Sequence, residues 1–161
     1  MLTYCLALVI LADQPVELQK GCAVSFKDLL DRKYAPPLSL RDFEEYLLHV
    51  EYAPENLSFY LWLRKYDSLY KQWEAETGDV RGLNLPEKLS ETFNKALAQY
   101  FDGGPLELNI SAQAQLELAK SIQDSSNPAI FKPVISEVTE MLEQSKSRWL
   151  AMYSSTMITK R

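Results

Sequence analysis

The sequence predicts an all-α domain, because every strong apolar pattern in its 161 residues has a helical period. In the longest pattern the apolar residues recur every three or four positions and share one helical face, which we expect to be buried: Phe59, Trp62, Leu63, Tyr66, Leu69, Tyr70 and Trp73. Pro54 suits the first position of this helix, and Gly78 provides a stop signal. Residues 106–110 alternate apolar and polar side chains, but the sequence offers them no partner strand, so we interpret them as an extended loop.

The composition and charge indicate a folded protein and argue against one class of partner. With 47% hydrophobic residues, 24% charged residues and only five glycines, the chain has the composition of a helix-rich globular domain. A formal net charge of −5 leaves no basic face for a phosphate backbone. Nucleic acid is therefore not expected as a partner.

Side chains that carry catalysis or bind metals are scarce. Cys5 and Cys22 are the only cysteines, and without histidines at ligand spacing they make neither a zinc site nor a disulfide scaffold. His49 is the only histidine, and its place on a helical pattern favours a structural role over a catalytic one. We expect no catalytic residue, no metal and no cofactor, and a reducing cytosol is the simplest compartment.

Residues 1–12 form a strongly apolar segment with no basic residue ahead of the apolar run. The segment is shorter than the roughly twenty residues that span a bilayer, and it lacks the basic start of a signal peptide. We expect residues 1–22 to pack on the domain or to be poorly ordered, and we keep membrane contact as a less favoured alternative.

Two helices are predicted before the long one. The first is short, carries Phe26, Leu29 and Leu30, and ends before Pro36-Pro37. The second has Ser39 as its N-cap and Asp42 as the acid of a capping box. Its apolar face consists of Leu40, Phe43, Tyr46, Leu47 and Val50.

After the long helix, a further helix begins at Pro86 and ends at Asp102-Gly103-Gly104-Pro105, and Ser111 caps the next one. The positions predicted to be buried in these two helices are Leu89, Phe93, Leu97, Tyr100 or Phe101, Leu116, Ala119 and Ile122. Pro128 to Phe131 is predicted as a separate short turn. The chain then buries Val134, Val138, Met141 and Leu142, a last short helix holds Trp149 and Leu150, and residues 153–161 form a tail.

An ordered series of segments resembles regulator of G-protein signalling (RGS) domains. The signature is an acidic residue and Asn followed by an apolar, polar, aromatic, aromatic run, at Glu55-Asn56-Leu57-Ser58-Phe59-Tyr60. Similar pieces occur in the family's order at residues 25–30, 40–47, 51–63, 106–110, 130–131 and 137–150, and Pro36-Pro37 resembles fungal members. The resemblance implies an RGS domain over residues 23–152, with about nine helices in an antiparallel four-helix bundle and a subdomain made from both chain ends.

The resemblance also implies a function. RGS domains accelerate GTP hydrolysis by heterotrimeric G-protein α subunits (Gα) and so attenuate signalling. Gα already carries its catalytic arginine and its water-orienting glutamine, so the partner needs only to hold the switch regions in the transition-state conformation. We therefore expect a monomer that binds Gα in its GTP or transition-state form, in the cytoplasm or recruited to the inner face of the plasma membrane. The alternative is an RGS-like scaffold that binds a partner without accelerating hydrolysis.

Carried over by position, the Gα-binding surface comprises Tyr52, Glu55, Asn56, Glu107, Asn109, Met141, Ser145 and Arg148. The resemblance implies that Asn109 reaches the switch segments and that Asn56 meets a neighbouring switch. From the residues alone, Asn56 could serve the start of its helix and Asn109 could shape a turn. Ser145 stands where many members have an aspartate, and the segment from there to Trp149 is one residue shorter than in the family.

Overall fold

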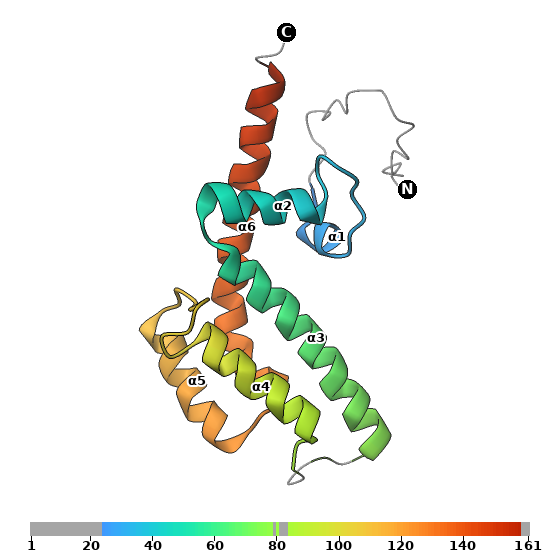
Figure 1. Cartoon of the computed structure of the whole chain (residues 1–161), viewed down its shortest axis with the longest axis vertical. Helices are drawn as coiled ribbons and strands as arrows, with labels where there is room; N and C mark the ends of the chain where they lie inside the picture. The colour runs from blue at the N-terminus through green and yellow to red at the C-terminus, as the bar shows by residue number, and fades with distance from the viewer. Residues whose placement is uncertain (1–23, 79, 81–83, 159–161) are drawn as a thin grey trace, which may run out of the picture.

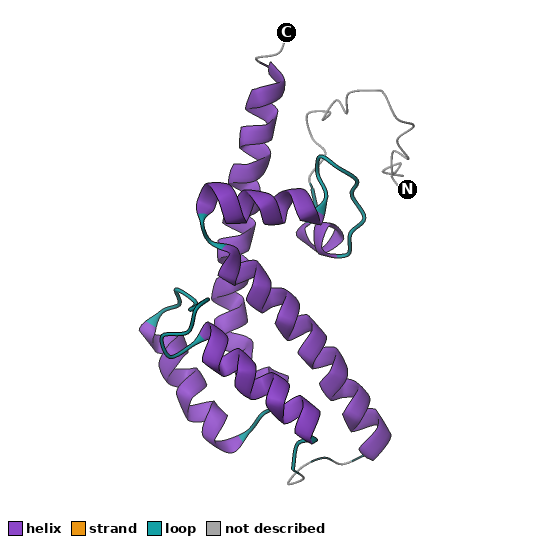
Figure 2. Ribbon diagram, viewed as in Figure 1, coloured by secondary structure: helices purple, strands orange, loops and turns teal. Residues whose placement is uncertain are grey.

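The structure is a computed structural model that describes residues 24–78, 80 and 84–158, with 153–158 described as backbone only. In chain order its elements are α1 (Phe26–Leu30), α2 (Leu40–Tyr46), the π-helical turn η1 (Leu47–Glu51), α3 (Pro54–Thr77), α4 (Glu87–Tyr100), α5 (Ala112–Asp124), the 3-10 turn η2 (Pro128–Phe131) and α6 (Lys132–Ile158). Helices are the only regular elements in this part of the chain (Figure 2), which confirms the all-α class. The predicted N-terminal segment, residues 1–22, lies outside the described residues.

Four helices, α3 to α6, form an antiparallel bundle (Figure 1). α3 packs against α4 and α6, and α5 packs against α6. α6 continues beyond the bundle, and there α2 packs against it (Figure 1). The bundle and a second group made from α1, α2, η1 and the C-terminal half of α6 agree with the architecture that the resemblance implied. None of the described helices is both long and apolar enough to cross a membrane.

The helix ends that the sequence predicted are present. Ser39 and Asp42 form a complete capping box on α2, and the side chain of Ser111 caps α5. Pro54 lies in the first turn of α3, and Gly78 ends that helix with a φ of 85°. A side chain at this φ would be strained, so glycine suits the position. Local chemistry sets these ends, and for that reason the sequence alone located them.

An aromatic cluster fills the bundle where α3, α4 and η2 meet. Phe131 of η2 is fully buried, and its ring centroid lies 5.5 to 6.1 Å from those of Phe59, Trp62, Phe93 and Phe101. Tyr66 is also fully buried, as predicted, and its hydroxyl donates to the carbonyl of Ser126 at 2.8 Å. Trp62 is only half-buried, and its ring stacks on that of Tyr66 with centroids 5.3 Å apart. The predicted burial of Trp62 is therefore met only in part.

The π-helical turn η1 corrects the predicted register of the second helix. The first four residues of the predicted apolar face are buried, but Val50 is 52% exposed, as is Leu48 at 48%. A π-turn bonds an N–H to the carbonyl five residues earlier, here Tyr52 to Leu47, and so widens the turn. The helical period of the sequence therefore holds as far as Leu47 and fails for Val50.

Three predicted burial positions on other helices are also wrong. In α5, Leu116 is 51% exposed and Ala119 is exposed, whereas Ala114 and Leu118 are buried. Both pairs follow a helical spacing of three or four residues, and only packing against α6 selects one of them. In α3, Leu69 is 37% exposed, because α3 packs against the other helices through its neighbouring faces and not through the face that carries Leu69.

α6 is one continuous helix from Lys132 to Ile158, so the prediction of a separate last helix is wrong. Neither glycine nor proline follows Pro133, and nothing in the sequence stops the helix. Trp149 is buried in this helix and packs on Phe43 of α2 with ring centroids 5.2 Å apart. The helix continues to Ile158, within the segment 153–161 that we predicted as a tail.

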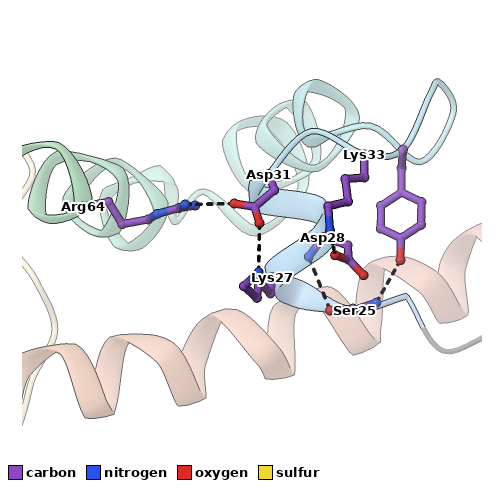
Figure 3. Close-up of polar contacts among 7 residues, drawn as sticks. Ser25, Lys27, Asp28, Asp31, Lys33 and Arg64 are labelled. Carbon is purple, nitrogen blue, oxygen red and sulfur yellow. Dashed lines mark hydrogen bonds and ion pairs between the residues drawn. The ribbon is translucent and has the colours of Figure 1, made fainter. Parts of the chain in front are cut away.

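Polar contacts attach α1 to the bundle (Figure 3). Nη2 of Arg64, on α3, donates to Oδ1 of Asp31 at 2.9 Å, and Lys27 pairs with the same carboxylate at 3.4 Å. The Arg64 guanidinium holds the pKa of Asp31 below its ordinary value. Such exposed pairs add little stability, and only the Arg64–Asp31 pair joins α1 to α3, because Lys27 and Asp31 both belong to α1 and its C-cap.

Candidate functional site

One end of the bundle gathers the start of α3, the end of α4 and the loop 101–111 that leads to α5 (Figure 1). The hydroxyls of Ser58 and Tyr100 lie 2.7 Å apart and join α3 to α4. The N–H of Leu108 donates to the carbonyl of Tyr100 at 3.0 Å and folds the loop back onto α4. Ser111 donates to the carboxylate of Glu137 on α6 through its N–H at 2.8 Å and its Oγ at 2.5 Å. These bonds attach the loop 101–111 to α4 and to α6.

Asn56 is buried in the first turn of α3 without capping that helix. The residue is 7% exposed, and the start of α3 has no side-chain cap. Its Nδ2 donates to Glu55 at 3.5 Å, and its Oδ1 has no hydrogen-bond partner among the described residues. Buried polar atoms are nearly always bonded, and an unpaired one costs about 1 to 3 kcal/mol. The helix-start role that the sequence left open for Asn56 is therefore not supported by its contacts.

Tyr52 is the most exposed large apolar residue in the described part of the chain, at 79%. It joins η1 to α3 in the left-handed region, with φ 54° and ψ 35°. Bulky residues rarely adopt this conformation, which costs on the order of 1 kcal/mol or more and is common at binding sites. Glu55, one turn further on, is half-exposed.

The loop presents Asn109 to solvent between two buried residues. Leu108 and Ile110 are buried and Asn109 is exposed, so the alternation seen in the sequence is an in-out-in pattern along an extended loop. Backbone bonds shape the loop, and the Asn109 side chain bonds to none of the described residues. Glu107 is exposed, and its Oε1 accepts the N–H of Gly103 at 3.2 Å. Of the two, only Glu107 helps to shape the loop.

Glu51, which we did not predict as a site residue, organises the contacts between η1 and α6. Its carboxylate accepts the Tyr46 hydroxyl at 2.8 Å and the Ser145 hydroxyl at 2.5 Å. Arg148 binds the same carboxylate through Nε at 2.6 Å and Nη2 at 3.1 Å, and Nη2 also donates to Ser145 Oγ at 3.0 Å. The Glu51 side chain is 13% exposed. We call this group, Tyr46, Glu51, Ser145 and Arg148, the Glu51 cluster.

The electrostatics of the Glu51 cluster follow from these bonds. The Arg148 guanidinium, with smaller contributions from Ser145 and Tyr46, lowers the pKa of Glu51 from 4.5 to about 2. Burial, reinforced by the nearby carboxylate, raises the pKa of the Tyr46 hydroxyl. Glu51 is therefore ionised and Tyr46 protonated at neutral pH, the states in which each hydrogen bond of the cluster can form.

The structure separates the predicted site residues into two groups. Ser145 is 5% exposed and points its hydroxyl at Glu51, so it is part of the internal Glu51 cluster. Arg148 belongs to the same cluster, although 56% of its side chain is exposed. Met141 is half-buried on α6, one turn before Ser145. The others, on the α3 start and the loop, lie at the end of the bundle.

The described residues contain no group of His, Cys, Asp and Glu side chains that could hold a metal ion. His49 is exposed and lies 3.1 Å from the carboxylate of Glu45 in an i, i+4 pair on the helix surface. The site consists of the exposed Tyr52 ring, the exposed Asn109 amide and the buried Asn56 amide beside the hydrogen-bonded Glu51 cluster, an arrangement suited to binding a protein surface.

Comparison with known proteins matches the chain to a protein family. The family model described as Regulator of G protein signaling domain matches residues 25–148, which include α1 through most of α6. A search of curated proteins finds no match.

Proposed function

The chain belongs to the regulator of G protein signaling (RGS) domain family, and from that premise we propose that it accelerates GTP hydrolysis by a heterotrimeric G-protein α subunit. The family regulates G-protein signalling by binding Gα, and its members activate the partner's GTPase without being enzymes themselves. Gα supplies the catalytic arginine and the water-orienting glutamine. The chain contributes by binding the switch regions more tightly in the transition state than in the ground state.

The observation that carries this proposal is that the Asn109 side chain bonds to none of the described residues, and that Asn56 makes only one long hydrogen bond, to Glu55 at 3.5 Å. Asn56 does not cap α3, and its Oδ1 is unpaired among the described residues. Asn109 is exposed in a loop that backbone bonds already shape. Amide groups donate and accept hydrogen bonds, so they suit polar groups on a mobile protein segment. Asn109 is therefore directly accessible to a partner, whereas Asn56, at 7% exposure, has an unpaired amide oxygen but offers a partner only a small area.

Single-turnover GTP hydrolysis by a panel of α subunits tests the proposal. We expect Asn109→Ala and Asn56→Ala each to reduce the acceleration by about tenfold or more, which corresponds to about 1.4 kcal/mol of transition-state stabilisation. Asn94→Ala is the matched control, because Asn94 is an exposed amide in the middle of α4, bonded only weakly to Ser90 at 3.5 Å. The control variant should keep the wild-type rate.

Binding to different nucleotide states distinguishes activation from scaffolding. An activator binds Gα carrying GDP and aluminium fluoride, a transition-state mimic, more tightly than Gα carrying GDP alone. The same two Asn substitutions should weaken binding to the mimic and leave the poor binding to the GDP form unchanged. Equal wild-type binding to both states, with hydrolysis unaffected by either substitution, would replace the activator proposal with the RGS-like scaffold.

The proposed contact surface extends beyond these two amides. It includes Tyr52, Glu55, Glu107 and Met141; Ser145 and Arg148, which the resemblance also implied, belong to the Glu51 cluster. We propose residues 23–152 as the functional domain, acting as a monomer on Gα in its GTP or transition-state form. The proposed location is the cytoplasm, with recruitment to the inner face of the plasma membrane.

A further inference from the structure

We infer that Glu51 is a positioning residue for Gα recognition: it clamps η1 to α6 and thereby holds Tyr52 in the exposed conformation that a partner contacts. This inference rests on the proposed function and adds a residue outside the predicted contact surface. It also assigns Ser145 and Arg148 a different task from direct contact, since both act through Glu51.

The backbone around Tyr52 needs external support. A π-turn ends at Glu51, and the next residue is a tyrosine in the left-handed region. π-turns are rare, and a left-handed conformation in a bulky residue persists only where the surroundings impose it. The Tyr52 side chain supplies no such support, because 79% of the residue is exposed.

The Glu51 cluster supplies that support from the far end of the sequence. Ser145 and Arg148 lie 94 and 97 residues beyond Glu51, on α6, which packs against α2, α3 and α5. Their three hydrogen bonds to one carboxylate fix its position in more than one direction, because the guanidinium binds in a bidentate manner and the hydroxyl approaches separately. Tyr46 adds a bond from the α2 side. Glu51 is thus fixed one residue before Tyr52.

The burial of Ser145 supports an indirect role for that residue. At 5% exposure it is about as buried as Asn56, but its hydroxyl, unlike the Asn56 Oδ1, is already bonded to Glu51 and Arg148. A hydroxyl here donates to the carboxylate, whereas an acidic side chain would repel it. Serine at this position therefore favours the internal clamp over a direct contact.

Amide hydrogen exchange followed by NMR tests the clamp without relying on activity. The N–H groups of Tyr52 and Ala53 both bond to the carbonyl of Leu47, so they report directly on the turn. In Glu51→Gln we expect these amides to exchange at least about tenfold faster, while amides at the centre of α3 keep their wild-type rates. Arg148→Ala should give the same local pattern, and the double variant should add little. Glu45→Gln is the matched control, because Glu45 pairs only with exposed His49.

GTPase acceleration tests the positioning role. Glu51→Gln should reduce single-turnover acceleration by about tenfold, and Glu45→Gln should not. In a Tyr52→Ala background, Glu51→Gln should cause little further loss, because the residue it positions is gone. Independent, additive losses would show that Glu51 does not act through Tyr52.

The results separate the clamp from the proposed function. Unchanged exchange at Tyr52 and Ala53, or an increase equally large in α3, would overturn the clamp whatever the activity. Faster local exchange with unaltered acceleration in an active protein would overturn the positioning role. If the wild-type chain accelerates no α subunit in the panel, the proposed function fails, and the exchange result alone then decides whether Glu51 clamps the turn.

Discussion

Two leucines on α5 provide a matched test of how this helix is packed. Leu118 is 2% exposed, whereas Leu116, two positions earlier, is 51% exposed. The apolar pattern alone predicts the opposite, with Leu116 in the core. Leu116→Ala and Leu118→Ala make the same chemical change in the same helix, so helix propensity and unfolded-state effects cancel in their difference.

The magnitude follows from burial. Leu→Ala removes about three methylene equivalents at about 0.8 kcal/mol each, and a cavity term raises the cost of a fully buried site to about 2 to 5 kcal/mol. We expect that loss for Leu118→Ala. Leu116→Ala removes a side chain that is already half in water, and its cost should stay below about 1 kcal/mol.

Urea denaturation at neutral pH, followed by circular dichroism, measures both free energies of unfolding. For a domain of this size the expected loss in Leu118→Ala lowers the melting temperature by about 5 to 15 °C. An unchanged urea dependence of the unfolding free energy shows that both variants unfold from comparable native states. Equal costs, or a larger cost for Leu116→Ala, would refute the packing of α5 and with it the position of the loop that α5 follows.

Two other substitutions test the core and the Glu51 cluster. Tyr66→Phe removes the hydroxyl that donates to the Ser126 carbonyl. We expect the free energy of unfolding, measured by urea denaturation, to fall by about 1 to 2 kcal/mol. A loss below about 0.5 kcal/mol would mean that the bond adds no net stability. The folded-state pKa of Glu51, about 2, lies below its ordinary 4.5, so Glu51 stabilises the fold fully above about pH 5 and loses this effect as the pH falls toward 2. The stability difference between wild type and Glu51→Gln should therefore be on the order of 2 kcal/mol at neutral pH and shrink in acid. A difference that does not change with pH would contradict the ion pair.

The sequence predicted the features that depend on near neighbours. The capping box of Ser39 and Asp42, the Ser111 cap and the Pro54 start involve residues within three positions of each other or of a helix end. The period of apolar residues identified the helices, and the run around Glu55-Asn56 indicated the family to which the chain belongs. The absence of a stop signal after Pro133 was also visible in the sequence, although we predicted a break there.

The features that the sequence did not reveal depend on distant contacts. Leu116 and Leu118 both fit a helical stripe, and only the position of α6 decides which of them is buried. Val50 is not on the buried face as predicted, because η1 widens into a π-turn before Tyr52, which adopts a left-handed backbone conformation. Glu51 binds Ser145 and Arg148, which lie 94 and 97 positions further along the sequence. The sequence by itself determined the helices, most of their ends and the family, because these rest on local hydrogen bonds and on spacing. Only the tertiary structure decided which helix faces are buried and which carboxylate joins η1 to α6. Packing and ion pairing connect segments that are far apart in the sequence, so the order of residues does not reveal them.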